Sequence, residues 1–128
     1  MSGIPSGNGT EVLKRTTIHA QSNTQTAFRW DGTMATTGTA TYTVPTNHII
    51  TVLSIMINEQ NDDTKTISIW VNDGGNDICI LNAQSLTAKQ TFVWNDKFVL
   101  NSGDKLLVTA QAGSNFDLYC SYIDQDWS

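Results

Sequence analysis

The sequence predicts an all-β fold, an antiparallel β-sandwich of about nine or ten short strands and of jelly-roll or immunoglobulin-like type. Apolar residues recur with a period of two in several short segments, turn-forming Gly, Asn, Asp and Pro residues separate these segments, and no segment has the 3.6-residue period of a helix. Thr, Asn, Ser and Gln supply 46 of the 128 residues and charged residues 15 %, which is unlike helical bundles or disordered chains. We therefore expect one folded domain.

The two ends of the chain differ from the rest in composition. Residues 1–10 contain three Gly, two Ser and one Pro, and this composition predicts a flexible N-terminal arm. Residues 11–124 are expected to form the sandwich domain. Residues 125–128 are expected to form a C-terminal tail whose Trp127 needs a surface to pack against.

Elements in the first half follow from local periodicity. The segment 11–20 alternates two mixed faces, which suits an edge or interface strand. These faces are Val12, Lys14, Thr16, Ile18 and Ala20 on one side and Leu13, Arg15, Thr17 and His19 on the other. Residues 28–30 are expected as a short strand, and the Thr-rich residues 36–44 as a β-prone segment with little to bury. Residues 48–58 are apolar on both faces, which predicts a central strand.

In the second half, Ile67, Ile69 and Val71 are expected to point inward and Trp70 outward. A turn at residues 73–77 leads into a strand at 78–81, and residues 82–89 form a less regular connection. Further strands are expected near residues 91–94, 98–100, 105–111 and 116–123.

Residue patterns for catalysis, cofactors or metals are not found. His19 and His48 belong to no metal-binding spacing, no G-x-S-x-G motif is present, and most Asp residues fall in turns, where they bond nearby backbone N–H groups. The net charge of −5 offers no basic stripe to a nucleic acid. We therefore expect a protein that is not an enzyme, binds no cofactor and contacts neither nucleic acid nor membrane.

Cysteines and apolar runs bear on the compartment. Cys79 and Cys120 each lie in an apolar strand pattern and are expected to be buried free thiols. No run is long enough for a signal peptide or a bilayer span, so we expect a soluble protein made in a cytosol.

Exposed aromatic side chains are the remaining candidates for function, because an outward Trp on a sheet is either a sugar platform or a protein interface anchor. Trp70 is the best outward candidate, whereas Trp30 and Trp94 fit the core equally well. The interface residues predicted from the sequence are Val12, Leu13, Ile18, Trp70 and Trp127.

Two segments carry a resemblance to a known group of proteins. The first is TYTVPTN at residues 41–47 before the central strand, and the second is LNSGDKLLV at residues 100–108. This pairing resembles small β-sandwich virion proteins of tailed bacteriophages, over about residues 41–123. The resemblance implies a part that decorates or cements a capsid, or belongs to a neck or tail, is commonly oligomeric, and has no catalytic residue.

These observations together predict a non-enzymatic bacteriophage virion protein. The first hypothesis is a capsid decoration or cement protein that stabilises the head by protein–protein contacts. A neck or tail component and a carbohydrate-binding module for host adhesion are the alternatives. The expected partners are the major capsid protein or other virion proteins and further copies of the chain, with a trimer favoured. The expected location is the virion, after assembly in the host cytoplasm.

Overall fold

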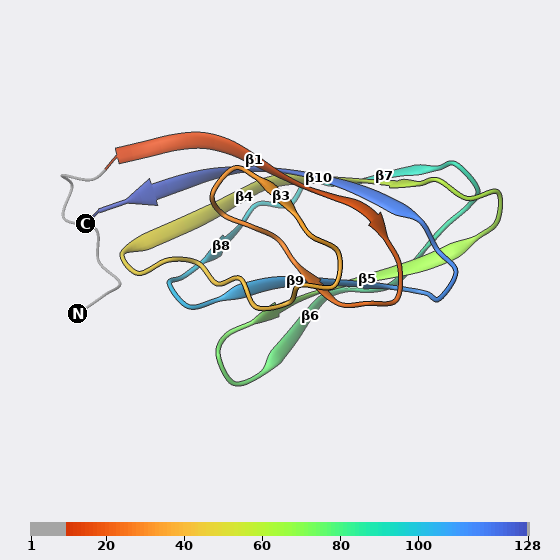
Figure 1. The fold of residues 1–128 in the computed structure, drawn as a ribbon. Coiled ribbons are helices and arrows are strands. Elements are labelled where there is room, and N and C mark those ends of the chain that lie inside the picture. The colour runs from red at the N-terminus through yellow and green to blue at the C-terminus, as the bar shows by residue number, and fades with distance from the viewer. Residues whose placement is uncertain (1–9, 128) are drawn as a thin grey trace.

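Two β-sheets face each other in the computed structural model, which describes residues 10–127 (Figure 1). The ten strands are β1 (Thr10–Gln21), β2 (Thr26–Ala27), β3 (Met34–Ala35), β4 (His48–Glu59), β5 (Lys65–Asn72), β6 (Asp77–Leu86), β7 (Thr91–Trp94), β8 (Phe98–Leu100), β9 (Lys105–Ala110) and β10 (Phe116–Asp126). Within the described part of the chain, no helix could cross a membrane.

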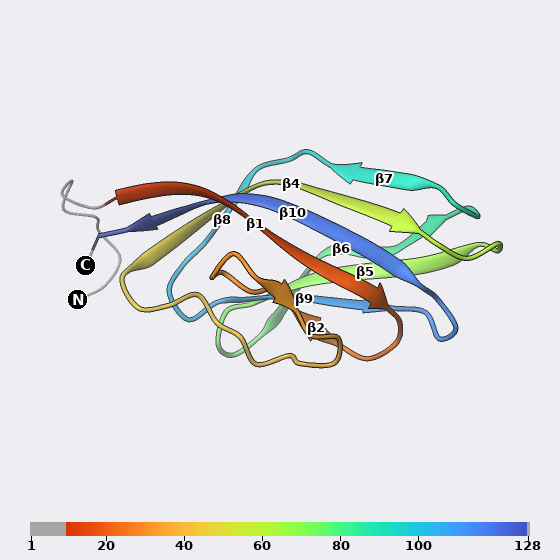
Figure 2. The ribbon, with the colours of Figure 1, turned by 45° about the horizontal axis from the view of Figure 1, so that its top comes forward.

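The order of strands decides between the two predicted topologies. The larger sheet has the order β3-β1-β10-β4-β7, with β8 also paired to β4, and the smaller sheet has the order β2-β9-β5-β6 (Figures 1 and 2). All pairs are antiparallel except the short β1–β3 pair. Because β7 and β8 pair with different ends of β4, they act as one interrupted strand, and apart from the two-residue β3 each layer then has four strands. The chain passes repeatedly between these layers and its last strand lies beside its first, which is a jelly roll.

Side chains that point between the sheets form the core. Strand β10 buries alternate residues from Phe116 to Tyr122, and Ile55 of β4 and Ile69 of the smaller sheet belong to the same cluster of buried residues. Trp30 packs edge-on against Tyr122, with 4.9 Å between ring centroids, and the hydroxyl oxygen of Tyr122 accepts a hydrogen bond from the Gly32 N–H. The two-residue alternation expected from the sequence therefore corresponds, in the structure, to alternation between side chains in the core and side chains that point outward.

Strand β4 confirms the prediction of a central strand, since β10 lies on one side of it and β7 and β8 on the other. The prediction of a strand at residues 28–30 is wrong. The Phe28 N–H donates to Leu106 of the smaller sheet, whereas the Arg29 N–H donates to Thr16 of the larger sheet. The chain crosses between the layers at this point, so it cannot continue a strand ladder.

Several other segments also differ between the sequence-based prediction and the structure. Residues 36–44 form no strand, and the connection expected at residues 82–89 is mostly strand, because β6 continues to Leu86 past an irregularity where Ala83 has a φ of 49°. The expected N-terminal arm falls on residues outside the described part of the chain, except Thr10, which begins β1. Strand β10 extends through Asp126, two residues into the segment expected as a tail.

The two cysteines lie in different environments. Cys120 is buried, as expected, but Cys79 is exposed, so the prediction of two buried thiols is wrong for Cys79. Cys79 lies on β6, which is an edge strand of the smaller sheet, and the β5–β6 hairpin projects from the body of the sandwich (Figure 1). The larger sheet does not cover this tip, and Ile78 beside it is 51 % exposed.

Candidate functional site

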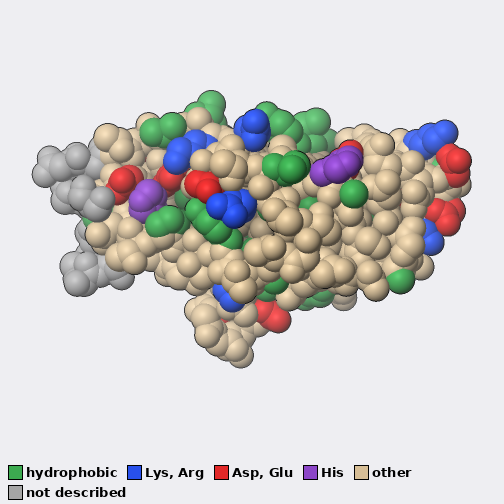
Figure 3. Space-filling model, viewed as in Figure 1, with side chains coloured by type: hydrophobic (Ala, Val, Ile, Leu, Met, Phe, Trp, Pro, Cys, Tyr) green, Lys and Arg blue, Asp and Glu red, His purple; other side chains and the backbone are tan. Residues whose placement is uncertain are grey.

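The side of the larger sheet that faces away from the core is the candidate site, and we call it the outer face. Figure 2 turns this sheet toward the viewer, with β1, β10, β4 and β7 side by side. Figure 3 shows hydrophobic side chains along the edge of the molecule formed by this sheet. On β10 the outward residues are Asp117, Tyr119, Ser121 and Ile123, which alternate with the buried residues of the core.

Strand register sorts the outward side chains into rows across the sheet. One row runs through Leu13, Ile123, Thr51 and Val99, and a second through Thr17, Tyr119, Met56 and Val93. We call them the Leu13 row and the Tyr119 row. Leu13 is 71 % exposed and Tyr119 44 %, and Met56, Val93 and Val99 are similarly exposed. The outer face therefore presents two apolar ridges to solvent.

A trough separates the two ridges, and its lining includes Leu53 and Lys14 as well as two serines. Ser121 of β10 pairs with Ser54 of β4 at this point, and Arg15 of β1 stands at its edge. The trough has a volume of about 450 Å³ and is walled by Leu13 on one side and Tyr119 on the other. We call this hollow the serine trough.

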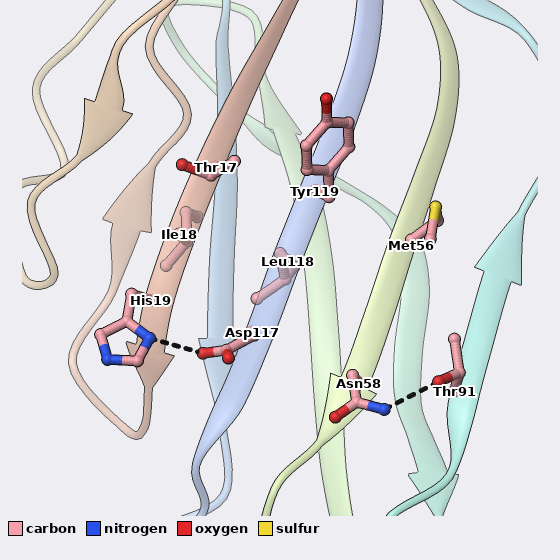
Figure 4. A pocket seen from close by; sticks show the side chains of 9 residues that line it. All are labelled: Thr17, Ile18, His19, Met56, Asn58, Thr91, Asp117, Leu118 and Tyr119. Carbon is pink, nitrogen blue, oxygen red and sulfur yellow. Dashed lines mark hydrogen bonds and ion pairs between the residues drawn. The ribbon is translucent and has the colours of Figure 1, made fainter.

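A second hollow lies on the other side of the Tyr119 row. Its volume is about 460 Å³, and Figure 4 shows the side chains that line it. The Nδ1 atom of His19 lies 2.9 Å from Oδ1 of Asp117, and Nδ2 of Asn58 donates to Oγ1 of Thr91 at 2.7 Å. We call this hollow the polar hollow. The four polar side chains are paired across neighbouring strands, and none of them is a nucleophile aligned with a base.

A cluster of charged side chains ties the strands together at the end of the sandwich where β1 begins and β10 ends (Figure 3). The Asp124 carboxylate is 3 % exposed; it accepts a hydrogen bond from Lys14 Nζ at 2.9 Å, and its other oxygen lies 2.6 Å from Nδ1 of His48. Nε2 of His48 lies 3.6 Å from a carboxylate oxygen of Asp126. These contacts join β1, β4 and β10, and no hydroxyl or thiol stands beside the imidazole in them, so we assign the cluster a structural role.

Acidic residues of the turns behave as expected from the sequence. Oδ1 of Asp73 accepts hydrogen bonds from the N–H groups of Asn76 and Gly75, and these bonds hold the pKa of Asp73 below its ordinary value. Among the described residues, no group of three or more His, Cys, Asp and Glu side chains is placed to hold a metal ion.

The five interface residues predicted from the sequence do not form one surface. Leu13 is on the outer face, whereas Ile18 is 1 % exposed in the core, so the prediction that Ile18 contacts a partner is wrong. Val12 shares the inward side of β1 with Ile18 but is 46 % exposed. Trp70 is half-buried on the outward side of the smaller sheet, between Cys79 and Leu107, and the Trp127 N–H donates to the Asn47 carbonyl.

Sequence reasoning missed Tyr119, Met56, Val93 and Val99 as members of the site. The alternation along residues 116–123 already separated Tyr119 from the buried series, and this was the available signal. The sequence carried no signal that Tyr119 would stand beside Met56, because strand register between distant segments sets that contact.

The fold and the site define a jelly-roll protein with an exposed, ridged apolar sheet face. No protein-family model and no curated protein matches the chain. A solved structure titled "Bacillus endospore appendages form a novel family of disulfide-linked pili" is 15 % identical, with a TM-score of 0.48 over 100 % of this chain and 98 % of the other.

Two viral structures are also similar to this chain in shape. The extra small virus particle of the giant freshwater prawn Macrobrachium rosenbergii is 10 % identical, with a TM-score of 0.47 over 100 % of this chain and 86 % of the other. The infectious bursal disease virus Gx strain is 10 % identical, with a TM-score of 0.48 over 91 % of this chain and 34 % of the other.

Proposed function

We propose that this chain is a non-enzymatic structural protein of a virion, and specifically a capsid decoration or cement protein of a tailed bacteriophage. The observation that carries the proposal is the outer face, whose ridges place Leu13, Met56 and Tyr119 in solvent. The exposed apolar side chains of this face amount to on the order of 500 Å², the size at which such patches mark interaction sites. The face therefore serves protein–protein contact.

Charge and position of the face agree with this role. Its central rows carry one charged side chain, Arg15, so docking there depends on shape and apolar contact more than on charge. Strand β1 begins at Thr10, three residues before Leu13, so the nine preceding residues join the chain at one end of the outer face. We propose that these residues add contacts to a neighbouring subunit, as expected of an arm.

Partners and location belong to the same proposal. The partners would be the major capsid protein or other virion proteins together with further copies of the chain, and the location would be the virion. A neck or tail component would use the outer face in the same way. The trimer expected from the sequence is one possible assembly, for which light scattering would report about 42 kDa, three times the chain mass of 14.0 kDa; the twofold assembly argued below is the alternative to it.

Binding to purified, undecorated capsids of tailed phages tests the proposal. The chain should co-sediment with such capsids, and Leu13→Asp should weaken this binding at least tenfold, because it places a charge on the ridge. Ile78→Asp is the matched control, since Ile78 is 51 % exposed on β6, away from the outer face. Equal binding by both variants, or no binding by the unaltered chain to any undecorated capsid, would refute the proposal.

Carbohydrate binding is a second candidate, favoured by the polar hollow. Tyr119 lines this hollow together with the His19–Asp117 and Asn58–Thr91 pairs, with its ring directed away from them in Figure 4. An aromatic ring, acids and amides are groups that bind sugars. Trp70, the platform expected from the sequence, is half-buried and lies on the other sheet. Retardation in glycan-containing gels that Tyr119→Ala abolishes would support this candidate, and unaltered migration in all gels would reject it.

A further inference from the structure

We propose that the outer face binds the outer face of a second copy of this chain about a twofold axis, with Tyr119 of each copy seated in the serine trough of the other. The inference rests on the proposed function and narrows it, because among the partners proposed there it assigns a second copy of the chain, rather than the capsid protein, to the outer face. It also replaces the expected threefold contact at this surface with a twofold one.

The rows of the outer face alternate in height along the strands. In order they are the Leu13 row, the serine trough, the Tyr119 row and the polar hollow. On β1 and β10 successive rows are two residues apart, or about 7 Å at the rise of a β-strand. On β4 a register shift inserts Leu53 between the Leu13 row and the serine trough, so the regular spacing holds on β1 and β10.

A twofold axis across the strands makes this surface complementary to itself. When the axis passes between the serine trough and the Tyr119 row, it reverses the strand direction of the second copy. The Tyr119 row of each copy then lies over the serine trough of the other, and the Leu13 row lies over the polar hollow of the other. Every ridge meets a hollow, as isologous contacts require of a surface that binds itself.

The other twofold arrangement does not fit. An axis parallel to the strands keeps the strand direction and reverses only the order of the strands. The Tyr119 row would then lie on the Tyr119 row of the second copy, and the serine troughs would face each other and stay unfilled. Packing at protein density excludes this arrangement.

The proposed contact is strongest near the axis. Stacked sheets are rotated against each other by about 30°, so rows mesh best at the central strands, here β10 and β4. Tyr119 would lie over Ser121 of the second copy, and Met56 over Ser54 of the second copy. The seryl hydroxyls offer hydrogen-bond partners to the Tyr119 hydroxyl, so the buried phenol is not left unpaired.

Area and charge agree with a second copy as the occupant. Four strand positions about 4.8 Å apart and about 11 residues long give a face on the order of 700 Å², near the roughly 800 Å² per partner of a standard interface. Arg15 would lie over Thr17 of the second copy, so no like charges oppose each other in the central rows. Nη1 of Arg15 also donates to the Gly32 carbonyl at 3.1 Å, which anchors it at the sheet edge. His19 and Asp117 form part of a polar rim, as at other interfaces.

Sedimentation equilibrium of the full chain from about 1 to 200 μM tests the inference. The unaltered chain should approach about 28 kDa, twice its mass of 14.0 kDa. Tyr119→Ser, which removes the ridge, and Ser121→Arg, which fills the trough, should each raise the dissociation constant at least tenfold. Both positions lie on the outer face, and circular dichroism confirms that each variant folds. Ile78→Ser is the matched control and should dimerise like the unaltered chain.

Three results would overturn the inference: a mass near 14.0 kDa throughout, a mass near three chains, or variants that associate as strongly as the unaltered chain. Amide hydrogen exchange adds a fourth, because pairing through the free edge of β6 would protect β6 amides on association, whereas face-to-face packing would not. The inference and the proposed function fail separately. A dimer that binds no capsid refutes only the function, and a monomer that binds capsids refutes only the dimer.

Discussion

Replacing Asp124 with Ala should destabilise the protein by more than any exposed charge substitution. The Asp124 carboxylate is 3 % exposed and contacts Lys14 at 2.9 Å and His48 at 2.6 Å. The substitution removes the carboxylate that both groups contact, and leaves the Lys14 ammonium without this partner. Because Lys14 and His48 lie on β1 and β4, on either side of β10, the loss of these contacts acts on the centre of the larger sheet.

The magnitude follows from how far each partner is buried. Breaking a fully buried ion pair costs about 3–5 kcal/mol. Lys14 is 30 % exposed and His48 20 % exposed, so both are able to recover some hydration, and Asp126 still lies 3.6 Å from Nε2 of His48. We therefore expect a loss of about 2–3 kcal/mol, because the desolvation penalty of the unpaired groups is only partly retained. This corresponds to a fall in Tm of about 10 °C for a domain of this size.

Urea unfolding and thermal unfolding by circular dichroism measure this loss at neutral pH. Asp62→Ala is the matched control, because Asp62 pairs with Lys89 at 3.0 Å while 85 % exposed. Exposed pairs contribute little, so the control should lower Tm by no more than about 2 °C. Equal losses in the two variants would refute the reasoning from burial.

Three further predictions concern thiols, acid and the core. One thiol per native chain should react with a thiol reagent, because Cys79 is exposed whereas burial raises the pKa of Cys120 to about 12. Labelling followed by mass spectrometry checks this, and modification of Cys120 in the native protein would contradict it. A side-chain hydrogen bond from Arg29 lowers the pKa of Asp31, so its stabilisation is present above about pH 4 and lost as pH falls; Asp31→Asn should flatten the acid limb of a urea-unfolding series. Ile55→Ala should cost about 2–5 kcal/mol by the same assay, since Ile55 is fully buried.

The faces of individual strands were predictable from the sequence. Along β10 the buried and outward series alternate as expected, and on β5 Ile67 and Ile69 point inward while Trp70 points outward. The period of two is a property of extended backbone, so it survives any tertiary arrangement in which the segment stays a strand. Residues 28–30 carried the same pattern but cross between the sheets. An alternation over only three residues was too short to predict a strand reliably.

Whether a given face is covered was not predictable in the same way. Ile18 and Val12 share one side of β1, yet Ile18 is 1 % exposed and Val12 46 %. Cys79 and Cys120 lie in similar apolar segments, yet only Cys120 is buried. For Val12 the difference depends on how far the opposing sheet extends. For Cys79 it depends on pairing with the outward Trp70 of β5, which places the thiol on the side away from the core.

Turn residues and the two-residue period act locally, so the sequence was enough to predict an antiparallel sandwich and to say which side chains of each strand point the same way. The jelly-roll topology follows instead from the order of strands in the folded sheets. The tertiary structure alone brought Tyr119, Met56 and Val93 into one ridge beside the serine trough. Register between β10, β4 and β7 creates that surface, and register depends on the packing of the whole core, which no local segment encodes.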